Sequence, residues 1–144
     1  MYYTFGTYSS YLILQIIKAI ILKYRKLPFI LLLLATGVIF IGTLYPADRL
    51  YEINIWDYDK IGHFLAFAIW TFLLGIVWAL KKKETPSLFW VFVYGLSFGL
   101  LIEFLQFMLP TNRSPELYDF IADGLGSGFA ILILPFFFRQ LFKD

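Results

Sequence analysis

Four long apolar runs constrain what this chain can fold into. They cover residues 28–45, 61–80, 87–109 and 119–138. Each is close to the roughly 20 residues of helix that cross a hydrocarbon core about 30 Å thick. Because the runs are unbroken and do not alternate between polar and apolar residues, they predict helices and exclude the strands of a membrane barrel. The expected fold is therefore an all-α, integral membrane four-helix bundle.

The composition supports the same class. Hydrophobic residues make up 60% of the 144 residues and charged residues 15%, a more apolar balance than soluble domains carry. The net charge of +2 is too small to indicate a nucleic-acid partner, so membrane lipid is the expected partner. The absence of cysteine excludes disulfides and thiolate metal sites. We find no internal repeat and no separate soluble domain.

Residues 1–27 precede the transmembrane domain, which we place at residues 28–144. Their apolar stretch is too short to cross a membrane, and Lys18 interrupts it. On a helix, Lys18 shares one polar stripe with Gln15 and Arg25, and the remaining surface is almost wholly apolar. This pattern predicts an amphipathic helix lying in the membrane interface. A flexible leader is the alternative.

The distribution of basic residues predicts the orientation. Lysine and arginine gather before the first run, between the second and third, and after the fourth: Lys18, Lys23, Arg25, Lys26, Lys81, Lys82, Lys83, Arg139 and Lys143. Taken together, the loops at residues 46–60 and 110–118 carry fewer basic residues than acidic ones. Because cytoplasmic segments carry the excess of lysine and arginine, we expect both termini in the cytoplasm.

Polar side chains recur at the outward ends of the last three runs. The set comprises Lys60, His63, Glu103, Gln106, Arg113, Asp119 and Asp123. These ends meet on one side of the membrane, so we expect the seven side chains to form a polar pocket in the outer leaflet. A carboxylate within hydrocarbon is costly unless it has a partner. Glu103 should therefore face the interior of the bundle.

The charges of this set do not balance, because its two basic side chains face three carboxylates. A protonated His63, a protonated Glu103 or a bound cation would each supply the missing positive charge. Simpler structural roles are also open. His63 would then only bond a neighbouring carbonyl, and Asp119 would only cap the last helix.

Small residues predict how the third and fourth runs pack. Gly95 and Gly99 share a helix face with Glu103, and Gly126 shares one with Asp123. Small residues let helices approach closely in lipid, where burial of apolar surface alone does not drive association. We therefore expect these two helices to pack face to face, with their acids at the outer end of the seam.

Five short motifs occur in order along the chain: Thr43-Leu-Tyr-Pro46, Asp59-Lys60-Ile-Gly-His63-Phe64, Glu103-Phe-Leu-Gln106, Pro110-Thr-Asn-Arg113 and Asp119-Phe-Ile-Ala-Asp123-Gly124. Together they resemble the VanZ-like family of small bacterial membrane proteins. The resemblance implies a four-helix domain in the bacterial cytoplasmic (inner) membrane. The family's namesake is an accessory factor that lowers susceptibility to the glycopeptide teicoplanin. Many members have Asn where this chain has Asp123, so the cluster here holds one more carboxylate.

Two classes of function fit these observations. The first is a cell-envelope accessory protein whose pocket binds a lipid headgroup, a cell-wall precursor or a glycopeptide-related ligand. The alternative is a membrane enzyme acting on a lipid-linked envelope substrate, with Glu103 or His63 as general acid or base. Lys60 and Arg113 would then hold a phosphate or carboxylate. Since no recognised catalytic motif is present, we favour binding.

Ion or proton transport through Glu103 and His63 is a third class. Four short helices without a mid-membrane break leave little room for alternating access. We expect no cofactor. A metal site built from His63, Glu103 and an Asp is chemically possible, but carboxylates with one histidine at these separations match no recognised ligand spacing, so we expect no metal ion either. A homo-oligomer is compatible with the sequence.

Overall fold

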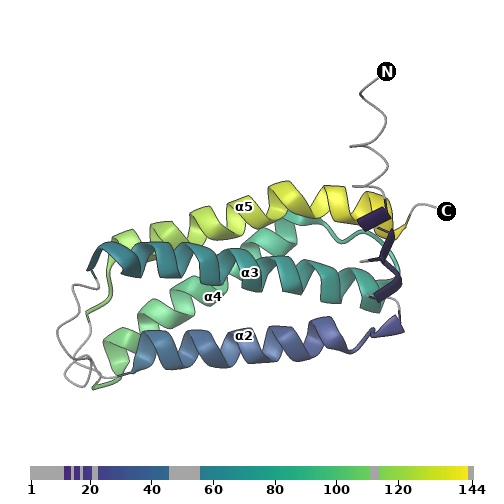
Figure 1. The fold of residues 1–144 in the computed structure, drawn as a ribbon. Coiled ribbons are helices and arrows are strands. Elements are labelled where there is room, and N and C mark those ends of the chain that lie inside the picture. Colours follow the sequence, from purple (N-terminus) through teal and green to yellow (C-terminus); the bar gives the residue numbers. More distant parts are fainter. Residues whose placement is uncertain are drawn as a thin grey trace.

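The computed structural model describes residues 12–13, 15–16, 18–20, 23–45, 56–110 and 114–142. Four long helices follow one another in this part of the chain: α2 (Leu27–Leu44), α3 (Trp56–Lys82), α4 (Leu88–Met108) and α5 (Leu117–Leu141). They run up and down in one bundle, so α3 and α5 begin at the end where α2 and α4 finish (Figure 1). The expected all-α four-helix bundle is confirmed.

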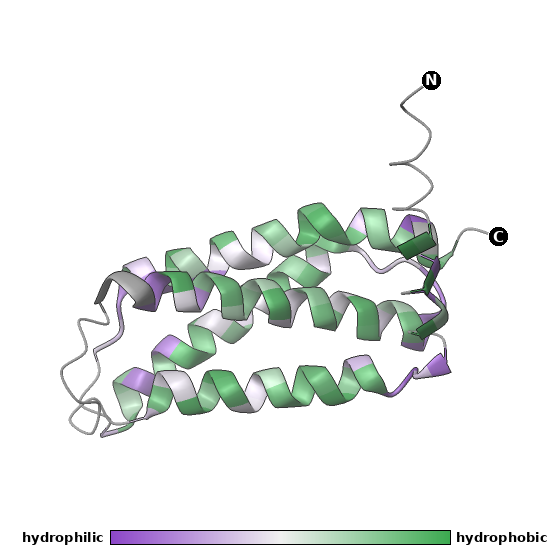
Figure 2. Ribbon diagram, in the orientation of Figure 1, coloured by the Kyte–Doolittle hydropathy of each residue, from purple (hydrophilic) through white to green (hydrophobic). Residues whose placement is uncertain are grey.

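All four helices are long and apolar enough to cross a membrane. Many of their large apolar side chains point outward, among them Leu34, Val38 and Ile41 of α2. Figure 2 shows hydrophobic residues along the middle of each helix and hydrophilic residues gathered toward the two ends of the bundle. An outer surface of this kind is stable in lipid and would be costly in water. The protein is a multi-pass membrane protein.

Some predicted boundaries need correction. The run at residues 87–109 agrees closely with α4. The helix that contains the run at 61–80, α3, begins earlier, at Trp56, so residues 56–60 are helical and do not belong to the loop. Residues 46–55, the rest of that loop, lie outside the described residues. The extra helical turn places Lys60 on the helix surface, from which its side chain reaches α5. Before α2, the described residues among 12–20 are helical, and their position in the membrane interface stays a prediction.

Glycine contacts show which helix faces meet. A side chain at Gly99 of α4 would lie 2.9 Å from Oδ2 of Asp123, so α4 and α5 do pack together here as expected. The expected place of Gly126 is wrong. A side chain there would collide with the carbonyl oxygen of Phe64 and lie 3.0 Å from the backbone nitrogen of Ala68, both on α3. Gly126 therefore serves the contact between α3 and α5, the most extensive in the bundle.

Two apolar clusters hold the helices together. One lies toward the end of the bundle where α5 finishes and includes Ile76 and Leu134. The other comprises Ile39, Phe67, Phe98 and Ile102, which come from α2, α3 and α4. Phe67 lies one helical turn after His63, and the two rings are parallel with centroids 6.5 Å apart. The second cluster therefore closes the inner side of the polar residues.

Candidate binding site

The candidate site begins at Lys60, whose ammonium joins α3 to α5. Its Nζ donates hydrogen bonds to Oε2 of Glu116 at 3.0 Å and to Oδ1 of Asp119 at 3.1 Å. The side chains of Lys60 and Glu116 are 36% and 30% exposed, whereas that of Asp119 is only 6% exposed. These three residues, which we call the mouth of the site, therefore extend from the partly exposed surface to the interior of the bundle.

The structure assigns Asp119 a different role from that of a helix cap. The N-cap residue of α5 is Glu116, whose side chain makes no capping hydrogen bond, and Asp119 lies in the first turn. A carboxylate there is favoured by the positive end of the helix dipole, and this one also pairs with Lys60. The capping alternative for Asp119 is therefore wrong. Sequence reasoning missed Glu116, although an acid just before an apolar run is a signal for a helix start.

Deeper in the bundle, His63 pairs with Asp123. Nδ1 of His63 and Oδ1 of Asp123 are 2.8 Å apart, and the two side chains are 4% and 0% exposed. The residues are 60 positions apart in the sequence. The partner of His63 is thus a carboxylate of α5 and not a neighbouring carbonyl. The other oxygen of this carboxylate, Oδ2, is buried, lies against Gly99 of α4 and has no hydrogen-bond partner among the described residues.

Glu103 of α4 completes this inner group. Its Oε2 accepts a hydrogen bond of 2.9 Å from the backbone N–H of Glu116. Its Oε1 is buried and has no hydrogen-bond partner in the part of the chain that the structure describes. One nitrogen of His63 and one oxygen each of Glu103 and Asp123 lie within 4.8 Å of one another. Three helices therefore direct polar atoms at one small volume, and Glu103 faces the interior as expected.

Gln106, one turn beyond Glu103, connects α4 to a different helix. Its Nε2 donates a hydrogen bond of 3.0 Å to the carbonyl oxygen of Thr43 near the end of α2. Its Oε1 is buried and has no hydrogen-bond partner within the ranges that the structure describes. Gln106 thus lies beside the inner group without joining the ion pairs. Arg113 lies outside the described residues, so its expected place in the pocket stays a prediction.

Acidic side chains outnumber basic ones in the described part of the site. Lys60 and His63 face five carboxyl groups, those of Asp59, Glu103, Glu116, Asp119 and Asp123. Asp59 forms a second close group with His63 and Asp119 beside the mouth. Carboxylate oxygens accept hydrogen bonds and bind cations. This site is therefore suited to cationic groups and hydrogen-bond donors more than to anions.

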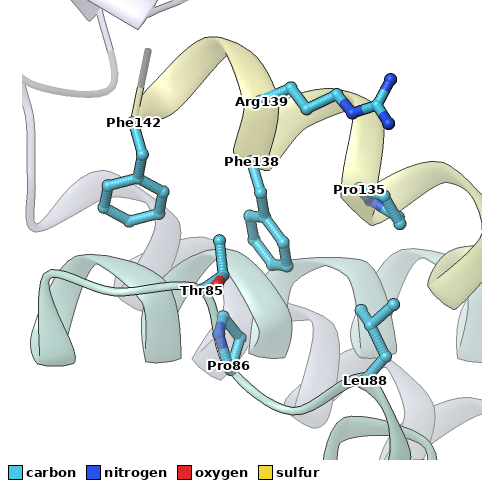
Figure 3. A pocket seen from close by; sticks show the side chains of 7 residues that line it. All are labelled: Thr85, Pro86, Leu88, Pro135, Phe138, Arg139 and Phe142. Atoms are coloured by element: carbon cyan, nitrogen blue, oxygen red, sulfur yellow. The ribbon is translucent and has the colours of Figure 1, made fainter. Parts of the chain in front are cut away.

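A groove at the opposite end of the bundle has a different character. It lies between the start of α4 and the end of α5 and is lined by Thr85, Pro86, Leu88, Pro135, Phe138, Arg139 and Phe142 (Figure 3). Its lining is mostly apolar, and Arg139 is the one ionisable residue among the described residues that line it. The polar group where α3 and α5 begin is therefore the stronger candidate site.

Comparison with known proteins identifies the family. The model of the VanZ/LLP1 family matches residues 27–139. The chain belongs to the VanZ/LLP1 family. The matched segment includes nearly all of α2–α5 and every described residue of the candidate site. No curated protein and no solved structure matches this VanZ/LLP1 chain. Membership makes it a membrane protein related to the cell envelope.

Proposed function

We propose that this VanZ/LLP1 protein is an accessory protein of the cell envelope that binds an amine-bearing headgroup, carried by an envelope lipid or a lipid-linked cell-wall precursor. The observation that carries the proposal is the acid-rich site, which is partly exposed at its mouth and buried at its base. The mouth is partly exposed at Lys60 and Glu116, and the base is buried at His63 and Asp123. A headgroup at the membrane surface would meet this mouth directly.

The mouth already holds an ammonium group. Two carboxylates, those of Glu116 and Asp119, converge on the single Nζ of Lys60 at hydrogen-bond distance. Such charge-assisted bonds are stronger than neutral ones. A ligand amine of the same chemistry would compete for these carboxylates. Lys60, on its flexible stem, would then be free to contact the phosphate of the same headgroup.

The arrangement of basic residues supports a site in the outer leaflet. Lys81 and Lys82 end α3, and Arg139 lies in the last turn of α5, all at the end opposite the candidate site. Since cytoplasmic ends carry the excess of lysine and arginine, we place this end and both termini in the cytoplasm. The polar mouth would then open at the outer surface of the bacterial cytoplasmic membrane, where cell-wall precursors are used.

A second candidate is catalysis on a lipid-linked envelope substrate. The observation that favours it is the buried pair of His63 and Asp123, since a carboxylate bonded to Nδ1 orients an imidazole as a general base. Glu103 lies close enough to act as a second acid or base. This alternative requires turnover of a lipid-linked substrate by the purified protein, whereas binding alone requires none.

The deciding experiment compares two lipids that differ in the headgroup. The purified full chain is titrated with phosphatidylethanolamine or phosphatidylglycerol carrying the same acyl chains, and bound lipid is counted by native mass spectrometry. We expect phosphatidylethanolamine to bind more tightly. Glu116→Gln should weaken its binding about tenfold, because a charged hydrogen bond contributes about 1.5 kcal/mol. Glu84→Gln, on the exposed loop at the other end, is the matched control.

Equal binding of the two lipids, or a Glu116→Gln variant as selective as the control, would contradict the proposal. A cellular readout separates binding from a resistance role. At equal membrane levels of the two variants, loss of the headgroup site should change susceptibility to envelope antibiotics, including teicoplanin. If only lipid selectivity changes and susceptibility does not, glycopeptide resistance is not this protein's role.

A further inference from the structure

We propose that His63, Glu103 and Asp123 form a binding site for one divalent transition-metal cation at the buried base of the candidate site. This inference goes beyond headgroup recognition and does not depend on it. It rests on the positions of three ligating side chains and on two buried oxygen atoms that have no partner among the described residues.

The three side chains come from three different helices and converge. His63 belongs to α3, Glu103 to α4 and Asp123 to α5, and one ligating atom from each lies within 4.8 Å of the other two. Nitrogen and carboxylate ligands bind zinc at about 2.0–2.2 Å, so two ligands of one ion lie about 3–4 Å apart. The side chains would need to move by less than about one ångström to hold an ion of this size.

Two buried carboxylate oxygens are a second, independent observation that points to a cation. Oδ2 of Asp123 and Oε1 of Glu103 are both buried, and neither accepts a hydrogen bond from any residue that the structure describes. The side chain of Asp123 is 0% exposed. A buried carboxylate oxygen without a partner is costly, and more so at membrane depth. One cation between these carboxylates would neutralise both side chains at once.

Gly99 keeps α4 close to the carboxylate of Asp123. A side chain at this position would lie 2.9 Å from Oδ2, and 3.2 Å from Cβ of the same residue. A larger residue would therefore push Asp123 away from Glu103, which lies one turn further along α4. This close approach of backbone to carboxylate brings ligands from α4 and α5 within reach of one ion.

The ligand types indicate the class of metal. An imidazole with two carboxylates suits zinc or manganese(II). Imidazole prefers transition metals, and carboxylates bind zinc as well as manganese. Magnesium and calcium are bound mainly by oxygen ligands and fit this set less well. From the sequence we expected no metal, because the spacing matched no known motif. Ligands that come from three separate helices produce no such motif.

The test uses metal ions alone. The purified full chain is stripped with chelator in a detergent free of amine lipids and titrated with Zn²⁺ and with Mn²⁺ by calorimetry. We expect one ion bound per chain. Glu103→Gln and Asp123→Asn keep the shape of each side chain, remove one charged ligand, and should each weaken binding at least tenfold. Glu84→Gln, distant from the site, should bind as the unaltered chain does.

The outcomes are distinct. If the folded chain binds neither ion, or if both ligand variants bind as tightly as the control, the proposal is wrong. Thermal unfolding without metal establishes which variants are folded. If one ligand variant does not fold, the metal affinity of the other tests the proposal. Because amine lipid is absent from these titrations, a negative result here leaves headgroup binding unaffected. Equal binding of the two lipids would likewise not contradict the metal site.

Discussion

Among the glycines that the structure describes, Gly126 lies closest to the backbone of a neighbouring helix, and Gly126→Ala should destabilise the bundle. The added methyl group would collide with the carbonyl oxygen of Phe64 and would lie 3.0 Å from the backbone nitrogen of Ala68. Both obstacles are backbone atoms of α3, so neither can rotate aside as a side chain would. The two helices would have to move apart by roughly an ångström to restore ordinary contact.

The expected magnitude follows from two opposing effects. Overpacking a close contact costs about 1–3 kcal/mol. Because the obstacle here is backbone, we expect a cost at the upper end of this range, about 3 kcal/mol. Replacing glycine by alanine inside a helix returns about 1 kcal/mol. We therefore expect Gly126→Ala to lower the free energy of unfolding by about 2 kcal/mol. Separation of α3 from α5 should also lengthen the hydrogen bond between His63 and Asp123.

The same helix provides a matched control. A side chain at Gly128 would meet Phe92 at 4.0 Å, which is ordinary contact, so Gly128→Ala should be neutral or stabilising by up to about 1 kcal/mol. Reversible unfolding of both variants in mixed micelles with increasing denaturing detergent would give the two free energies. If Gly126→Ala is as stable as Gly128→Ala, the close backbone contact between α3 and α5 does not exist as described.

Two further predictions concern orientation and the attachment of α2. A cysteine at Ser114 should react with a membrane-impermeant reagent in intact cells faster than one at Lys82, and the reverse order would overturn the orientation and the outer-leaflet site. Trp70→Phe should lower the free energy of unfolding by about 0.6 kcal/mol, the mean for a hydrogen bond between membrane helices. It removes the 2.9 Å bond from Nε1 to Oγ1 of Thr36, which joins α3 to α2. An unchanged stability would contradict the bond, and a loss well above about 1.7 kcal/mol would include weaker stacking of the smaller ring on Phe98.

The sequence alone determined the class of fold and most members of the site. The thickness of the hydrocarbon core sets the length of a crossing helix, so four apolar runs of that length were sufficient to predict four helices. The cost of burying charge in hydrocarbon made Glu103 and His63 stand out, and it required them to face the interior. Both side chains do lie in the interior group. These conclusions needed only the periodicity of a helix and the chemistry of each side chain.

Only the tertiary structure decided which partner each side chain meets. Helical periodicity places Gly126 and Asp123 on one face, but it does not say which neighbouring helix lies opposite that face. The structure places Gly126 against α3, and it places Asp123 between His63 of α3 and Gly99 of α4. The pairing of Lys60 with Glu116 likewise depends on how far α3 extends beyond the apolar run. Hydrogen bonds and metal ligation require positions accurate to a few tenths of an ångström, and that accuracy comes from packed backbones, which no single run of residues contains.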